Sequence, residues 1–219
     1  DLDGTLADTA LDLLNAGNLT FAEIGINYRL KENRDEGISS KGGRSTIRQG
    51  LFHSNGFVDE KIVDSLYPIF LKNYEKVIND NSVLYEGTLE MLNYLKSNKI
   101  QLGVCTNKPK EQADILLKKL NIHSFFEIVV GPDTYSCPKP NPKPLLKTID
   151  YLGASIQSAV FVGDTNTDYM TSKNANVPFI LLSYGHGVIH QSFDILSTPY
   201  VAKVSLEIPD LILKILKKY

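Results

Sequence analysis

Five short apolar runs limit what this chain can fold into more than any other feature of its sequence. They are rich in β-branched and aromatic residues and span residues 100–105, 126–130, 159–163, 177–182 and, less clearly, 199–204. Runs that are apolar without a regular polar alternation are typical of strands buried on both faces. Because helical patterns separate them, we expect an α/β fold, a Rossmann-like parallel sheet covered by helices.

Helical periodicity is clearest in two segments, residues 109–121 and 205–219. Each carries apolar residues at positions i, i+3, i+4 and i+7, which places them on one face of a helix. In the first segment these residues are Ala113, Leu116, Leu117 and Leu120. Pro109 suits the first turn of that helix, where its missing N–H has no helical partner.

Residues 12–81 differ from the rest, since they show helical patterns and turns around Gly37 to Gly43 but no convincing strand. A helical block of this size reads as an insertion, not as a linker. We therefore predict an α/β core domain of residues 1–11 and 82–219 and an inserted helical domain of residues 12–81. The strand that should precede Asp1 in such a core is expected upstream of the first residue.

Charge and composition exclude several classes of function. The 219 residues carry a net charge of −2 with a pI near 6.1, which gives no electrostatic footprint for nucleic acid or an anionic membrane. No apolar run approaches the roughly 20 residues that a membrane span needs. Cys105 and Cys137 lack the spacing of a zinc site or a disulfide framework. Reduced thiols and a cytoplasmic location are therefore expected.

Ligands of open parallel sheets bind beyond the carboxyl ends of the strands, and polar residues of this chain gather there. Those that follow a predicted strand are Thr106, Asn107, Lys108, Asp164 and Asp168. Asp1 and Asp3 would follow the strand that is expected upstream. We therefore expect acidic residues from distant parts of the sequence to meet at one edge of the sheet.

Bringing Asp1, Asp3 and Asp164 to one edge has an electrostatic consequence. Two carboxylates about 4 Å apart repel by roughly 4 kcal/mol at a surface-like dielectric constant. The group therefore needs a cation or retains a proton. Oxygen ligands without His or Cys favour Mg²⁺ or Ca²⁺ over zinc, and Mg²⁺ with few protein ligands commonly accompanies substrate phosphates. The acidic group thus predicts both a metal and a phosphoryl group.

Four short motifs follow one another along the chain: DLDGTL at 1–6, CTNKP at 105–109, KPNP at 139–142 and VGDTNTD at 162–168. They resemble the four ordered motifs of the haloacid dehalogenase superfamily, and most closely those of its phosphoglycolate-phosphatase-like branch. The helical insertion after the first motif is similar to the α-helical cap of that branch. LYEGTLEML at 84–92 resembles the return from cap to core. The resemblance covers nearly the whole chain.

The resemblance implies roles for the acidic residues. Asp1 would be the nucleophile that forms an aspartyl-phosphate intermediate. Asp3 would be the general acid that protonates the leaving alcohol and then the base that activates water. Mg²⁺ would bind the Asp1 side chain, the Asp3 backbone carbonyl and Asp164.

The remaining motif residues would bind the phosphoryl group or hold its ligands. Thr106 and the backbone of Asn107 would bind phosphoryl oxygens, and Lys139 would neutralise the charge of the transferring group. Asp168 would orient Lys139 or the waters of the metal. Arg44, in the helical insertion, would contact a carboxylate or a second phosphate of the substrate.

Simpler interpretations of these residues stay open from the sequence alone. Asp1 and Asp3 stand in a sequence that is common in turns. Asp168 would also stabilise the first turn of a helix without any catalytic role. Lys139 and Arg44 would also be explained as ordinary charged residues on a solvated surface.

The expected activity is Mg²⁺-dependent hydrolysis of a phosphomonoester on a small metabolite, with 2-phosphoglycolate as the favoured substrate. A sugar-phosphate mutase of the β-phosphoglucomutase type shares both aspartates and the cap and is the main alternative. The non-enzyme alternatives are a phospho-receiver domain, which lacks a helical cap, and a binding protein on the same fold. The sequence leaves monomer and homodimer both open.

Overall fold

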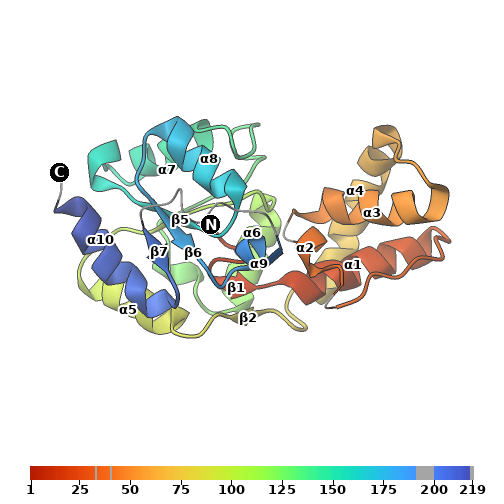
Figure 1. Ribbon diagram of the computed structural model, residues 1–219, viewed down its shortest axis with the longest axis horizontal. Helices are drawn as coiled ribbons and strands as arrows, with labels where there is room; N and C mark the ends of the chain where they lie inside the picture. Colours follow the sequence, from red (N-terminus) through yellow and green to blue (C-terminus); the bar gives the residue numbers. More distant parts are fainter. Residues whose placement is uncertain (33, 40, 191–199, 218–219) are drawn as a thin grey trace. The chain divides into compact units, whose positions relative to one another are not determined.

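The computed structural model describes residues 1–32, 34–39, 41–190 and 200–217 of the chain. They form two compact units, Asp1–Asp8 with Leu84–Tyr219 and the inserted segment Thr9–Val83 (Figure 1). We call these the α/β unit and the helical unit. The sequence analysis placed the first boundary between the two units between residues 11 and 12. The structure places it earlier, because α1 (Ala10–Glu23) lies as a whole in the helical unit.

The strands of the α/β unit are short and pair in parallel. They are β3 (Gly103–Cys105), β4 (Ile128–Val130), β5 (Phe161–Gly163), β6 (Phe179–Leu182) and β7 (Val201–Ala202). β3 pairs with β4, and β5, β6 and β7 pair in that order. Each of the five predicted runs contains one of these strands, and the predicted parallel α/β fold is confirmed.

Two further strands, β1 (Ala7–Asp8) and β2 (Val83–Leu84), pair with each other where the chain leaves and re-enters the α/β unit. The sequence analysis did not predict them. Each has two residues, which is too short for a pattern of period two to be recognised.

Helices cover the strands on two sides. They are α5 (Thr88–Ser97), α6 (Lys110–Lys119), α7 (Lys143–Tyr151), α8 (Asn166–Ala175), α9 (His186–His190) and α10 (Ile208–Leu216), with 3₁₀ turns η1 (His123–Phe125), η2 (Ile156–Ser158) and η4 (Ser205–Glu207). α7 packs on β3 and β4, α8 packs on β5 and β6, and α5 packs with α10 and η4. In Figure 1, α7 and α8 lie on one side of β5, β6 and β7, and α5 and α10 lie on the other. Among the described residues, no helix is both long and apolar enough to span a membrane.

The centre of this core is β6, whose four residues are all buried. β6 lies between β5 and β7, and helices pack on the sheet, which explains its uninterrupted apolar sequence. Phe161, Phe179 and Leu181 form one apolar cluster with Leu145 and Ile149 of α7. Each such side chain contributes roughly 1.5–3 kcal/mol when fully buried. This packing holds the carboxyl ends of the strands, where the polar residues stand, in fixed positions.

The described part of the helical unit contains α1, α2 (Glu36–Ser39), α3 (Gly43–Asn55) and α4 (Glu60–Val77), and α1 packs against α3 and α4. Gly50 permits the close approach of α3 to α1, since a Cβ there would lie 2.1 Å from the Phe21 ring. α2 lies in a segment where the sequence analysis expected turns only. Its four residues make one helical turn, too short to show a helical period.

The two ends of the helical unit are joined by one buried carboxylate. Asp12, in the first turn of α1, is fully buried. It accepts hydrogen bonds from the backbone N–H groups of Asn81 and Ser82, from the Asn81 side-chain amide at 2.8 Å and from the Ser82 hydroxyl at 2.6 Å. These bonds fix the point where the chain leaves the unit next to the point where it enters.

We expect Asp12→Ala to lower the free energy of unfolding by about 3 kcal/mol, because the substitution leaves the donors of Asn81 and Ser82 without their acceptor. Urea denaturation followed by circular dichroism measures the change. The matched control is Asp80→Ala, at an exposed aspartate of the same unit, which should change the free energy by less than about 0.5 kcal/mol. Equal, small changes in both variants would contradict the role given to Asp12.

Candidate active site

The predicted site residues of the α/β unit lie beyond the ends of two strands and in the segments beside them. Thr106 and Asn107 follow β3, and Asp164 follows β5. The backbone nitrogen of Asp1 donates a hydrogen bond to the carbonyl of Val162 at 2.8 Å, which places the first residue alongside β5. Residues far apart in the sequence therefore meet at one edge of the sheet.

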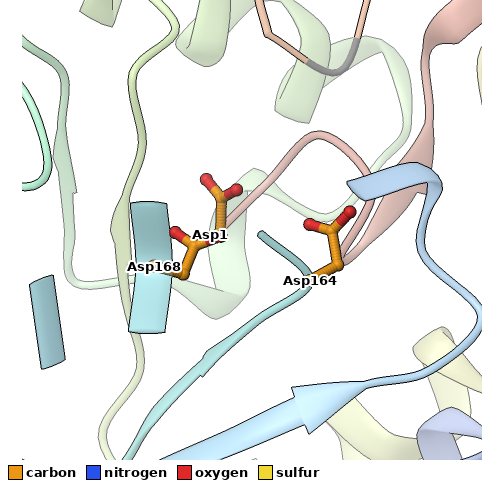
Figure 2. Close-up of side chains that lie close together, drawn as sticks. All are labelled: Asp1, Asp164 and Asp168. Atoms are coloured by element: carbon orange, nitrogen blue, oxygen red, sulfur yellow. The ribbon is translucent and has the colours of Figure 1, made fainter. Parts of the chain in front are cut away.

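Three carboxylates form the centre of the site. Oxygen atoms of Asp1, Asp164 and Asp168 all lie within 4.8 Å of one another (Figure 2). Asp1 and Asp164 meet as expected, but the side chain of Asp3 does not belong to this group, and Asp168 takes its place. The sequence analysis placed the Asp3 backbone carbonyl, and not its carboxylate, on the metal, and that assignment stays a prediction.

Lys139 is the cation of this group. Its side chain is only 2% exposed, and its Nζ lies 2.6 Å from Asp168 Oδ1 and 2.8 Å from Asp1 Oδ1. Burial, the largest single effect, would raise the pKa of Asp168, but nearby positive charge, that of Lys139 first, and the hydrogen bonds from Lys139 and Thr165 together hold that pKa below its usual value. Lys139 is therefore not a solvated surface lysine, and it holds Asp1 and Asp168 in place.

Asp168 also closes the amino end of α8. Its Oδ2 accepts hydrogen bonds from the backbone N–H and the hydroxyl of Thr165, and the Thr165 hydroxyl accepts one from the backbone N–H of Asp168 at 3.1 Å. This reciprocal arrangement is a capping box. Asp168 is thus both a helix-capping residue, through Oδ2, and a partner of Lys139, through Oδ1.

Asp164 is fully buried, and no lysine among the described residues forms an ion pair with it. Its oxygens accept hydrogen bonds from the Thr5 hydroxyl at 3.0 Å and from the backbone N–H of Gly187 at 2.7 Å. Burial raises the pKa of Asp164 to about 6, and the negative charge of Asp168 adds to this effect. Gly185 lets the loop after β6 close on Asp164, since a Cβ there would lie 2.2 Å from the Asp164 Cβ.

Asp3 is bound by a second lysine. Its Oδ1 lies 2.7 Å from the Nζ of Lys108, whose side chain is 4% exposed. The sequence analysis named Lys108 at a strand end but gave it no role. It did not single out Thr5 or Gly187 either, because a threonine and a glycine near a turn are explained by the turn itself.

The residues after β3 position the Lys139 segment. The Asn107 side chain accepts a hydrogen bond from the Lys139 backbone N–H at 2.8 Å and donates one to the Lys139 carbonyl at 3.1 Å. Thr106 is buried, and its hydroxyl accepts a hydrogen bond from the backbone N–H of Lys108 at 3.1 Å. Asn107 therefore contributes through its side chain to the local structure, which the sequence analysis did not anticipate.

Arg44 lies in α3 of the helical unit. Its guanidinium forms an ion pair with Asp64 and lies over the ring of Tyr67, 4.3 Å from the ring centre. Both partners belong to the helical unit, and the arginine is thus held on the surface of its own unit.

The donor set of the acidic group suits a hard divalent cation. All three ligand candidates are carboxylates, and neither histidine nor cysteine belongs to the group. Asp164 carries a negative charge above about pH 6 at a buried position, at a cost that an adjacent cation would offset. The residues present therefore fit Mg²⁺ or Ca²⁺.

Comparison with known proteins identifies the class to which this site belongs. The sequence profile of the family described as haloacid dehalogenase-like hydrolase matches residues 1–182. The chain therefore belongs to this family, as the four motifs indicated.

The similar proteins narrow the class further. The phosphoglycolate phosphatase of Agrobacterium fabrum is 33% identical over 186 residues, which cover 85% of this chain and 79% of that protein. The phosphoglycolate phosphatase of Rhodospirillum rubrum is 35% identical over 190 residues, with 85% and 78% covered. A predicted phosphoglycolate phosphatase from Haemophilus somnus has the same fold, with a TM-score of 0.83 at 22% identity over 96% of this chain and 95% of that one. The chain is a phosphatase of the phosphoglycolate-phosphatase-like branch.

We expect Lys139→Met to lower the free energy of unfolding by about 3 kcal/mol in the presence of EDTA, because it leaves two neighbouring carboxylates without their cation. Lys143→Met is the matched control, since Lys143 is exposed and four residues further along. It should change the free energy by less than about 0.5 kcal/mol. Urea denaturation measures both, and equal values would mean that Lys139 does not hold the carboxylates together.

Proposed function

We propose that this protein is a Mg²⁺-dependent phosphomonoester hydrolase that acts on a small phosphorylated metabolite, with 2-phosphoglycolate as the favoured substrate. The observation that carries the proposal is the contact of one buried lysine, Lys139, with both Asp1 and Asp168, beside Asp164. The names of the two relatives at 33% and 35% identity support the choice of substrate.

Asp1 would act as the nucleophile. One of its carboxylate oxygens attacks phosphorus, the bond from phosphorus to the alcohol oxygen breaks, and the electron pair of that bond stays on the alcohol oxygen. A proton passes from the Asp3 carboxyl group to this oxygen, so that a neutral alcohol leaves. Asp3 then accepts a proton from the water that attacks the aspartyl phosphate. As the water oxygen bonds to phosphorus, the bond from phosphorus to the Asp1 oxygen breaks with its electron pair on that oxygen, so that inorganic phosphate is released and the Asp1 carboxylate is regenerated.

Positive charge and hydrogen-bond donors around Asp1 would stabilise the transferring group. Lys139 lies beside Asp1 and would neutralise charge on the phosphoryl oxygens. Thr106 and the backbone of Asn107 would bind other phosphoryl oxygens. The hydrogen bonds that link the Asn107 side chain to the Lys139 backbone support this arrangement, because they hold the two segments together.

Mg²⁺ would be held by the Asp1 side chain, the Asp3 backbone carbonyl and Asp164, with Asp168 beside them. When bound, it would neutralise substrate charge during phosphoryl transfer. Asp164 supports this assignment, because it is buried and carries hydrogen bonds from Thr5 and Gly187 that fix its orientation.

The helical unit would serve as a cap that excludes water and limits the size of the substrate. Its place in the chain supports this role, since it is inserted directly after the acidic motif that begins at Asp1. Arg44 would select substrates with a second negative charge. To do so it would exchange its contact with Asp64 for the substrate.

We expect the protein to hydrolyse 2-phosphoglycolate in the presence of Mg²⁺ and to lose this activity in EDTA. The substitution Asp1→Asn, which removes the nucleophile, should lower kcat by more than about 10³-fold. Phosphate release measures all three. Circular dichroism of the variant serves as the control for folding. Comparable rates in Asp1→Asn and the unaltered protein would exclude Asp1 as the nucleophile.

The affinity for Mg²⁺ should depend on pH through Asp164, whose pKa near 6 in the metal-free protein means that a proton competes with the metal below that pH. The apparent affinity should be nearly constant above pH 7 and should fall by up to about tenfold for each pH unit below 6. Isothermal titration calorimetry of Mg²⁺ binding at several pH values from about 5 to about 8 measures this dependence. An affinity that does not change across the range would show that Asp164 is not a ligand.

A further inference from the structure

Residues 184–187, just beyond β6, hold a proposed metal ligand through their backbone, and we call them segment 184–187. Its start is fixed to the sheet, because the N–H of Ser183 donates to a carbonyl of β7 at 3.0 Å. Its end is fixed to the site, because the N–H of Gly187 donates to Asp164 Oδ2 at 2.7 Å. Between these points, a Cβ on Gly185 would lie 2.2 Å from the Asp164 Cβ. The position of the segment therefore depends on that of the Asp164 carboxylate.

Two side chains of segment 184–187 contact the strands at which the chain leaves and re-enters the α/β unit. His186 Nε2 lies 2.9 Å from Oδ1 of Asp8, the last residue of β1. The ring of Tyr184 meets the ring of Tyr85, the residue after β2, edge to face with centres 4.9 Å apart. The contact of His186 needs only a proton on Nε2, so a neutral imidazole can make it. The segment that holds Asp164 thus also contacts both connecting strands.

The pair of β1 and β2 has little backbone structure of its own. Each strand has two residues, and beside them the N–H of Tyr85 donates to the carbonyl of Leu6 at 3.2 Å. A pair this short opens locally at a much smaller free energy than the whole domain unfolds. Side-chain contacts to Asp8 and Tyr85 therefore contribute a large share of what keeps the two strands together.

We propose that segment 184–187 couples the occupation of the metal site to the pairing of β1 with β2. A cation on Asp164 fixes the carboxylate that accepts the Gly187 N–H, and this holds the segment more firmly. His186 and Tyr184 then pass the effect to the two strands. The inference rests on the proposed function, which places Mg²⁺ on Asp164. Such coupling between two places in a protein is reciprocal and typically amounts to roughly 5- to 150-fold.

Hydrogen exchange followed by mass spectrometry at residues 83–85 measures the opening of the strand pair. This stretch contains no proposed metal ligand. We expect saturating Mg²⁺, at a concentration set by calorimetry, to slow exchange there about tenfold in the unaltered protein. In the double variant His186→Phe with Tyr184→Leu the effect should be less than about twofold. Exchange at residue 187 should still be slowed by Mg²⁺ in that variant, because its bond to Asp164 is kept.

A second histidine–aspartate contact provides the matched control. His123 Nε2 lies 3.1 Å from Asp114 Oδ1, between η1 and α6. His123→Phe removes a contact of similar kind away from both connecting strands, and should leave the tenfold effect of Mg²⁺ unchanged. Circular dichroism checks the folding of each variant. If the double variant does not fold, His186→Phe alone tests the inference, and it should show an effect between about twofold and about fivefold.

Three results would overturn the inference. An effect of Mg²⁺ that survives in full in the double variant would mean that the metal acts on the strands through the first motif, where Asp1 and Asp3 lie. Unchanged exchange at residues 83–85 of the unaltered protein, with Mg²⁺ binding seen by calorimetry, would mean that the segment transmits nothing. Loss of the effect in His123→Phe would assign it to general destabilisation. Absence of Mg²⁺ binding in calorimetry would instead overturn the metal site of the proposed function, and the inference with it.

Discussion

The structure of this site depends on one buried ammonium group. Lys139 lies between Asp168 and Asp1, at 2.6 and 2.8 Å, and is almost inaccessible to solvent. Without it, carboxylates from different ends of the chain would repel one another at the edge of the sheet. Its position is fixed in turn by the two hydrogen bonds between its backbone and the Asn107 side chain. The loops after β3 and β4 are thereby joined to the acidic group.

Charge in the site is distributed unequally among the aspartates, and this gives each a different chemistry. Asp168 shares the Lys139 charge and is also tied to Thr165 at the start of α8. Asp164 is buried and accepts hydrogen bonds from Thr5 and Gly187, and burial raises its pKa. Asp3 is paired with Lys108 outside the group. Under the proposed function, these different neighbours would separate the aspartates for nucleophilic attack, metal binding and proton transfer.

The part of the fold that could be predicted is the part with long periodic signals. The runs that contain β3 to β7 are apolar because strands such as β6 are buried on both faces, and α6 and α10 follow regular helical spacing. β1, β2 and α2 were missed because each has no more than four residues. The first boundary of the helical unit was placed too late, because only Thr9 separates β1 from α1 and no linker marks the boundary in the sequence.

The amino-acid sequence by itself determined the parallel α/β fold and the family, since the order of strands, helices and four polar motifs is written in local residue patterns. It also indicated that Asp1 and Asp164 would meet, because the carboxyl ends of parallel strands share one edge. Only the tertiary structure decided which lysine neutralises which aspartate, that Asp168 and not Asp3 joins the group, and that the Asn107 side chain holds the Lys139 segment. Such pairings depend on distances of a few ångströms between residues 29 or more positions apart in the sequence, and burial, which sets their strength, is a property of the packed molecule alone.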